Sequence, residues 1–128
     1  MKILIVEDNA DLRAIYDSLF TAAGHTVNAC GNGLTAVTEA VDFHPDIVLL
    51  DIMMPEMNGY EFLTTIRNNT SMTPFIVVCS NISEQNDVAK AMAAGAHHYI
   101  RKSDVIGQKL VDTVIENYEQ FKASGNVV

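Results

Sequence analysis

The chain has 128 residues, of which 48% are hydrophobic and 19% charged, a balance that fits one globular domain and argues against disorder. Its formal net charge is −8, so phosphate backbones would repel it and we expect no direct nucleic-acid binding. No apolar run approaches the ~20 residues of a membrane span. The apolar start at Met1–Val6 stops at Glu7 without a small-residue cleavage site, so we expect a cytoplasmic protein without a signal peptide.

The first half of the chain predicts two strand–helix pairs. The strands are expected at Lys2–Val6 and Thr26–Cys30. The first helix ends at Gly24, and its inward residues at helical spacing are Leu12, Ile15, Tyr16, Leu19 and Phe20. The second helix is expected over about 34–43, before Pro45, with an inward face of Leu34, Val37 and Val41.

The second half predicts three more strands, at Asp46–Leu50, Pro74–Cys79 and His97–Arg101. The first two of these are continuously apolar, which is typical of strands covered by helices on both faces. The intervening helices are expected over about 59–68, on Phe62, Leu63 and Ile66, and from near Ser83 to Gly95, capped by Asn81 with Glu84. The last helix is expected over about 104–121, with inward residues Val111, Val114, Ile115 and Tyr118.

The order of these elements is (βα)₅, which predicts an α/β fold. Right-handed crossovers would place the strands in one parallel sheet with helices on both faces. Five strands suit an open doubly wound sheet and are too few for an eight-stranded barrel. We expect a single domain over residues 1–122 and a short tail over 123–128.

Chemically useful side chains follow four of the five strands. In open α/β sheets, ligands bind at the carboxyl ends of the strands, where these side chains would meet. The second strand ends in Cys30 and Gly31 and is expected to add nothing. The residues that end the first, third, fourth and fifth strands are, in that order, Glu7 with Asp8, Asp51, Ser80 and Lys102.

Three carboxylates in one place repel one another unless a cation joins them, and Mg²⁺ prefers such oxygen ligands. A carboxylate can also attack phosphorus, while a metal, a lysine and a hydroxyl neutralise the phosphoryl oxygens. Taken singly, each residue has an ordinary explanation: Glu7 and Asp8 as helix-capping acids, Asp51 and Ser80 as loop or helix starts, Lys102 as a surface cation. Their joint position at the strand ends favours a phosphoryl-transfer site.

Other candidate ligands are weaker. Cys30 and Cys79 lie in apolar stretches without C-x-x-C spacing, so we expect buried thiols in a reducing compartment. His97 and His98 are adjacent strand residues that point to opposite faces, so a shared zinc ion is not expected.

Three segments resemble the receiver domains of response regulators in two-component systems, over essentially the full length of the chain. They are residues 3–9 (ILIVEDN), residues 46–59 (DIVLLDIMMPEMNG) and residues 94–102 (AGAHHYIRK). The middle segment is highly specific. The resemblance implies a flavodoxin-like sheet of strand order 2-1-3-4-5 and a signalling phosphoacceptor rather than an enzyme.

The resemblance also implies site roles. Asp51 would be the phosphoacceptor, charged by a histidine kinase, a histidine phosphotransfer protein or a small phosphodonor. Asp8 and Asp51 would ligate Mg²⁺ (or Mn²⁺), with the backbone carbonyl of Met53 as a further ligand and Glu7 acting through water.

Lys102 would pair with the phosphoryl oxygens, the Ser80 hydroxyl would move to bind them, and Tyr99 would then swing inward. The face formed by the fourth helix, fifth strand and fifth helix would dock a downstream protein or output domain. A simple aromatic packing role for Tyr99 stays open. The chain would act as a monomer or as a phosphorylation-dependent dimer, without a membrane.

The chain departs from the family pattern at several positions. Ser103 replaces a proline that usually follows a cis bond; a cis bond before serine would cost ~3 kcal/mol, so we expect a trans bond that could displace Lys102. Asn81 replaces a small residue and could narrow access to Asp51. Met53 and Ile82 are bulky and apolar, and we expect them to hinder attacking water and slow dephosphorylation. Arg101 adds a positive charge for an acidic partner or is merely solvated at the sheet edge.

Three other classes of protein compete with this interpretation. An aspartyl-phosphate phosphatase would place a second acid where Met53 stands. A flavin-binding module would hold phosphate in the loop after the first strand, where Glu7 and Asp8 repel it. A degenerate receiver that binds partners without phosphorylation is supported only by Asn81 and Ser103. The kinase, pathway and output, and whether the chain stands alone, are left open.

Overall fold

The fold is described from a computed structural model, for residues 1–52, 58–69, 72–80 and 85–124. Strands and helices alternate along the described chain. The strands are β1 (Lys2–Val6), β2 (Thr26–Cys30), β3 (Ile47–Leu50), β4 (Phe75–Ser80) and β5 (His98–Arg101). The helices are α1 (Ala10–Ala22), α2 (Gly33–Phe43), α3 (Gly59–Asn69), α4 (Gln85–Ala94) and α5 (Gln108–Ala123).

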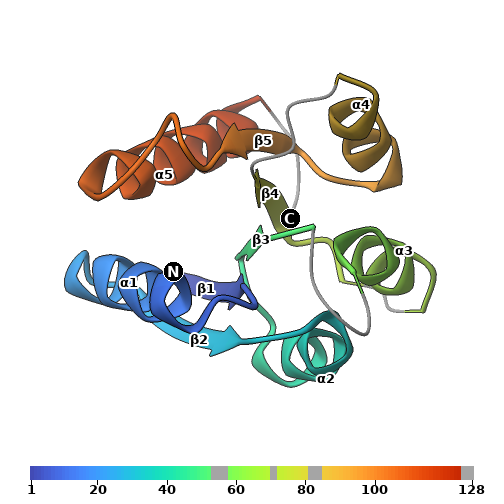
Figure 1. Cartoon of the computed structure of the whole chain (residues 1–128), viewed down its shortest axis with the longest axis horizontal. Helices are drawn as coiled ribbons and strands as arrows, with labels where there is room; N and C mark the ends of the chain where they lie inside the picture. Colours follow the sequence, from blue (N-terminus) through green and yellow to red (C-terminus); the bar gives the residue numbers. More distant parts are fainter. Residues whose placement is uncertain (53–57, 70–71, 81–84, 125–128) are drawn as a thin grey trace.

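The strands form one parallel sheet in the order β2-β1-β3-β4-β5, which confirms the predicted topology. Helices α1 and α5 cover one face of the sheet, and α2, α3 and α4 cover the other (Figure 1). No described helix is long and apolar enough to cross a membrane.

Alternating side chains of the central strands build two separate cores. Leu4, Val48 and Val78 belong to the core under α2, α3 and α4, whereas their neighbours Ile3 and Leu49 belong to the core under α1 and α5. Burial on both faces explains why β3 and β4 read as continuous apolar runs. Cys30 and Cys79 are buried free thiols, as predicted.

Three residues expected to point inward do not. Ile15 is 51% exposed, Leu34 58% and Val41 42%. In α2 the buried face is instead formed by Ala36 and Ala40. Their small side chains allow the helix to pack closely against the sheet, so the bulky residues beside them are left at the surface.

The start of one helix also differs from the expectation, whereas the ends of two others confirm it. Helix α5 begins at Gln108 rather than near Asp104, because residues 102–105 form a turn and Gly107 has φ +61°. Helix α1 ends before Gly24, whose φ is +95°. Helix α2 ends at Phe43, and the next residue, His44, has φ +54°, a left-handed conformation that favours glycine. The predicted cap of α4 by Asn81 and Glu84 lies outside the described residues.

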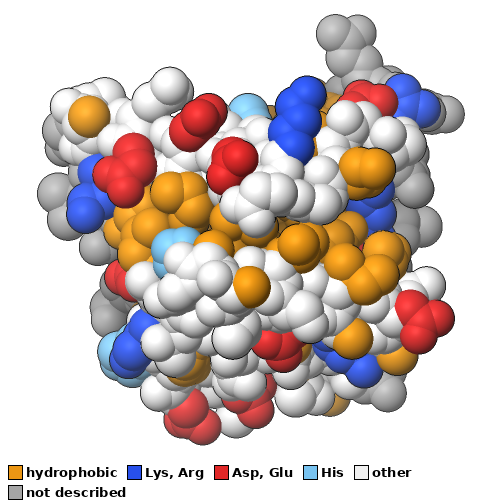
Figure 2. Space-filling view, turned by 90° about the vertical axis from the view of Figure 1, so that its left-hand side faces the viewer, with side chains coloured by type: hydrophobic (Ala, Val, Ile, Leu, Met, Phe, Trp, Pro, Cys, Tyr) orange, Lys and Arg blue, Asp and Glu red, His pale blue; other side chains and the backbone are white. Residues whose placement is uncertain are grey.

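An apolar groove lies on the surface between α1 and the loop that leads from β5 into α5. Ile15 lines it together with Ile106, which is 75% exposed, and Lys102 forms part of its wall. Figure 2 shows hydrophobic side chains gathered in a band between these two helices.

Candidate functional site

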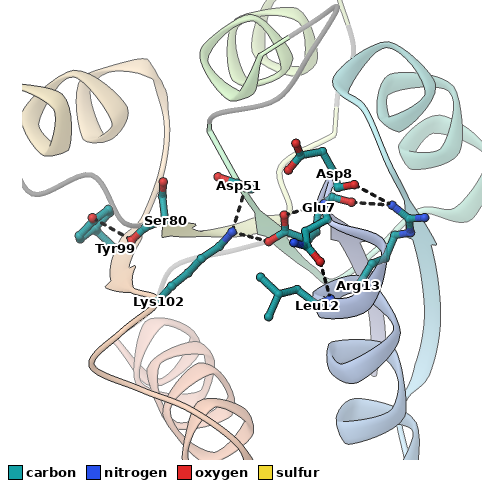
Figure 3. Close-up of polar contacts among 9 residues, drawn as sticks. Glu7, Asp8, Leu12, Arg13, Asp51, Ser80, Tyr99 and Lys102 are labelled. Carbon is teal, nitrogen blue, oxygen red and sulfur yellow. Dashed lines mark hydrogen bonds and ion pairs between the residues drawn. The ribbon is translucent and has the colours of Figure 1, made fainter.

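The carboxyl ends of β1 and β3 bring the predicted acids together. The two strands are neighbours, with Val6 paired to Leu50, and the Asp51 N–H donates to the Val6 carbonyl at 2.9 Å. Glu7 and Asp8 therefore stand beside Asp51 although more than forty positions separate them in the chain (Figure 3). This is the arrangement that the strand-end pattern predicted.

One carboxylate oxygen each from Glu7, Asp8 and Asp51 lies within 4.8 Å of the others. Glu7 is 2% exposed and Asp51 5%, whereas Asp8 is exposed to solvent. Within the described ranges, no other group of His, Cys, Asp or Glu side chains is close enough to share an ion. Clustered hard oxygen donors with like charge fit Mg²⁺ or Mn²⁺, and the open side at Asp8 leaves room for waters and a phosphate.

Lys102 supplies the positive charge of the site. Its Nζ lies 2.5 Å from Glu7 Oε1 and 3.0 Å from Asp51 Oδ2. Burial lowers the pKa of Lys102, but the bonds to Glu7 and the charge of Asp51 outweigh this and raise it, so the amine stays charged. The described chain has no cis peptide bond, so Lys102–Ser103 is trans, and Lys102 is not displaced by it.

Burial raises the pKa of Glu7 to about 7, and the nearby Asp51 charge adds to the effect. The Lys102 amine and the Asn9 N–H, which donates to Glu7 Oε2 at 3.2 Å, act in the opposite direction. One lysine therefore compensates the acids incompletely. That imbalance is a second feature that fits a bound cation.

Ser80 and Tyr99 lie on the other side of Lys102 (Figure 3). Ser80 ends β4 and is 2% exposed. The Tyr99 hydroxyl donates to the backbone carbonyl of Ser80 at 3.1 Å, and burial raises the pKa of this phenol. Their predicted roles as a switch remain predictions.

Gly59 was part of the family motif, but its packing role was not predicted. Its N–H donates to the Ile52 carbonyl at 2.9 Å. A Cβ atom at this position would lie 2.6 Å from Ile52 Cα and 3.0 Å from the Asp51 carbonyl oxygen. Only glycine allows α3 to start this close to the phosphoacceptor candidate.

Arg13 of α1 was also missed. Its Nη1 donates to the Glu7 backbone carbonyl at 2.9 Å. A contact between a side chain and a backbone oxygen leaves no signature in residue spacing, so only the structure reveals it.

Some predicted residues lie outside the site or outside the described chain. Met53, Asn81 and Ile82 are not described, so the Met53 carbonyl ligand and the three modulating roles stay predictions. His97 is occupied elsewhere: its Nδ1 accepts a hydrogen bond from the Ile76 N–H at 3.0 Å, and its ring stacks on Phe75.

The fold and this site define a doubly wound α/β domain with an acidic, lysine-bearing pocket at its carboxyl edge. The family model described as "Response regulator receiver domain" matches residues 3–114. The chain therefore belongs to the receiver family of two-component response regulators, which confirms the resemblance.

Curated relatives of similar sequence are regulatory or chemotaxis proteins. The chemotaxis protein CheY of Thermotoga maritima is 38% identical over 102 residues, covering 79% of this chain and 84% of that protein. The regulatory protein AtoC of Escherichia coli is 36% identical over 101 residues, and the Regulator of RpoS of the same species 38%. The match covers 22% of AtoC and 30% of the Regulator of RpoS, so this chain corresponds to a minor part of these longer proteins.

Solved structures agree as well. The N-terminal domain of a Wolinella succinogenes protein matches with TM-score 0.84 and 28% identity, over 98% of this chain and 99% of that one. A DNA-binding response regulator of the LuxR family from Staphylococcus aureus matches with TM-score 0.82 and 28% identity, over 91% of this chain and 98% of that one.

Proposed function

We propose that this receiver domain accepts a phosphoryl group on Asp51, from the phosphohistidine of a histidine kinase or phosphotransfer protein or from a small phosphodonor. A carboxylate oxygen of Asp51 forms the new bond to phosphorus. The bond between phosphorus and the donor nitrogen or oxygen breaks, and its electron pair leaves with the donor. The observation that carries this proposal is the Lys102 amine, held 3.0 Å from Asp51 Oδ2 at the edge of the acidic cluster.

Asp8 and Asp51 would hold Mg²⁺ directly, Glu7 through water, and the Met53 carbonyl would complete the protein ligands. When bound, the ion would supply positive charge for the carboxylates and the phosphoryl oxygens. Lys102 offers its N–H donors to Asp51 and keeps the acceptor carboxylate oriented.

The conformational change after phosphorylation would involve Ser80 and Tyr99. The Ser80 hydroxyl would bind the phosphoryl oxygens, and Tyr99, already bonded to the Ser80 carbonyl, would follow by changing its partner. The face of α4, β5 and α5 would then present a different surface to a downstream protein or output domain. We place this exchange in the cytoplasm, on the strength of the family.

Intact-mass spectrometry after incubation with acetyl phosphate and Mg²⁺ tests the proposal. We expect a single phosphoryl adduct that requires Mg²⁺ and is absent from Asp51→Asn. Asp46→Asn is the matched control, because Asp46 precedes the opposite end of β3 and its carboxylate accepts from the Lys2 N–H.

An adduct on Asp51→Asn, or one independent of Mg²⁺, would place the chemistry elsewhere. No adduct with either acetyl phosphate or a competent kinase would instead support a phosphorylation-independent binding module.

A further inference from the structure

Arg13 ties α1 to the backbone of the acidic loop. The residue lies in the first turns of α1, where its own N–H donates to the Asn9 carbonyl at 2.9 Å. Its guanidinium turns back toward the end of β1, as Figure 3 shows. Nη1 donates to the Glu7 carbonyl at 2.9 Å and, over a longer distance of 3.5 Å, to the Asp8 carbonyl. One planar group thus holds two consecutive peptide units.

Gly31 makes room for this guanidinium. The Glu7 N–H donates to the Cys30 carbonyl at 3.0 Å, which places Gly31 beside the acidic loop. A Cβ atom at Gly31 would lie 2.8 Å from Arg13 Nη1 and 3.5 Å from Cζ. The backbone of Gly31 is not in the left-handed region, so the absent side chain is needed for space and not for backbone conformation.

We propose that Arg13 is a positioning residue: by holding the Glu7 and Asp8 carbonyls it orients both carboxylates toward Asp51, and Gly31 is the space it requires. What the three acids are used for rests on the proposed function. The positioning itself is a property of the metal-free protein.

The sign of the metal response separates this role from a purely electrostatic one. The guanidinium is a positive charge close to a cation site, so by charge alone its removal would strengthen Mg²⁺ binding. Loss of positioning acts the other way, because groups that orient metal ligands typically contribute about 10–100-fold to metal affinity.

The first test is a double-mutant cycle of Arg13→Met and Gly31→Ala, with Mg²⁺ affinity measured by isothermal titration calorimetry. Methionine keeps an apolar stem but has no donors, while alanine at 31 pushes the guanidinium away. We expect each variant to bind Mg²⁺ about tenfold more weakly, as for other orienting groups. The double variant should be no weaker than Arg13→Met alone, because both changes break the same contact.

Arg13→Lys restores the charge without the planar fork, and we expect it to remain weak. Arg67→Met is the matched control. Arg67 Nη1 also donates to a backbone carbonyl, that of Ala93 at 3.1 Å, but this bond joins α3 to α4 and does not involve the acidic loop. This control should leave Mg²⁺ affinity unchanged.

A second readout needs neither metal nor phosphoryl group. In metal-free protein, Arg13→Met and Gly31→Ala should shift the same amide NMR signals, those of residues 7–9, and Arg67→Met should not. Four results would overturn the inference. They are tighter Mg²⁺ binding by Arg13→Met, wild-type Mg²⁺ affinity in Arg13→Lys, additive losses of affinity in the double-mutant cycle, and unchanged amide signals of residues 7–9. Wild-type protein that binds no Mg²⁺ while these amides still shift would contradict the proposed function and leave the positioning role supported.

Discussion

Lys102 is the residue on which the charge balance of the site depends. It bridges Glu7 and Asp51, which are both nearly excluded from solvent, and its own side chain is 14% exposed. Removing one partner of a buried ion pair leaves an uncompensated charge, which is far more costly than losing a surface pair.

We therefore predict that Lys102→Met lowers the free energy of unfolding by about 3 kcal/mol at pH 8 in the presence of EDTA. Added Mg²⁺ should restore part of this loss, because a bound cation replaces the missing charge. Urea unfolding measures both effects. Lys109→Met, at an exposed position, is the control, and an equally small loss in both variants would contradict the prediction.

At this scale the sequence predicted which charged side chains meet at the carboxyl edge of the sheet, while their roles stay predictions. Glu7, Asp8, Asp51 and Lys102 are found together because parallel strands bring their carboxyl ends to one edge. Arg13, Gly31 and Gly59 were not assigned their roles, since they act on backbone atoms or by leaving space. Gly31 directly follows β2, the strand whose end was expected to add nothing.

At the scale of elements, the end of α2 is strained. His44 follows the helix with φ +54° and ψ +61°, and it is exposed. A residue with a Cβ atom is disfavoured in this left-handed conformation by roughly 1–2 kcal/mol, whereas glycine adopts it readily.

His44→Gly should accordingly raise the free energy of unfolding by about 1 kcal/mol, since part of the relief is offset by the greater freedom of unfolded glycine. Urea unfolding checks the change. His44→Ala keeps the Cβ atom and should bring no gain, so equal stabilisation by both variants would point to loss of the imidazole instead.

His97 connects β4, β5 and α5. Besides accepting from the Ile76 N–H, its ring contacts Phe121 of α5 with centroids 4.8 Å apart. The residue is exposed, yet these neighbours bury part of the ring, and this burial lowers its pKa below the ordinary value of 6.5. A protonated Nδ1 would no longer accept the Ile76 hydrogen bond.

Lowering the pH should therefore destabilise the folded protein through His97. Below pH 6.5 the unfolded chain takes up a proton at His97 that the folded chain binds less well, so the stability contributed by neutral His97 is lost as pH falls through 6.5 toward the lowered folded pKa. His97→Asn keeps an acceptor near the Nδ1 position but does not titrate. We predict that the wild type loses stability relative to this variant between pH 7.5 and 5.5, as measured by urea unfolding. A constant difference across that range would contradict the prediction.

Helix faces were harder to predict than strands. Periodicity located α2 correctly but ranked its faces by hydrophobicity, and so placed Leu34 and Val41 inward. The actual contact depends on how close the helix can approach, which Ala36 and Ala40 decide. Strands β3 and β4 carried no such ambiguity because both of their faces are buried.

At the scale of the whole molecule, the proposed metal site exists only in the folded chain. Its acids come from β1 and β3, so the unfolded chain has no preformed site. A ligand that binds only the folded state stabilises it, by about 2.7 kcal/mol at one hundred times its dissociation constant.

Mg²⁺ should thus raise the midpoint of thermal unfolding, followed by circular dichroism, in a concentration-dependent way, and Mn²⁺ should act similarly. The increase should disappear in Asp8→Asn. Asp112→Asn, in α5 away from the acidic cluster, should respond like the wild type. An equal increase in Asp8→Asn would mean that the ion binds elsewhere.

The strand order also sets when the site is completed during synthesis. The three acids directly follow the neighbouring strands β1 and β3, within the first 51 residues, whereas Lys102 directly follows β5, at the far edge of the sheet. A growing chain that folds from its N-terminus therefore gathers the negative charges before their lysine has been made. Until β5 has been synthesised, the Lys102 amine cannot offset these carboxylates, so the charge balance of the site is completed only when the last strand joins the sheet.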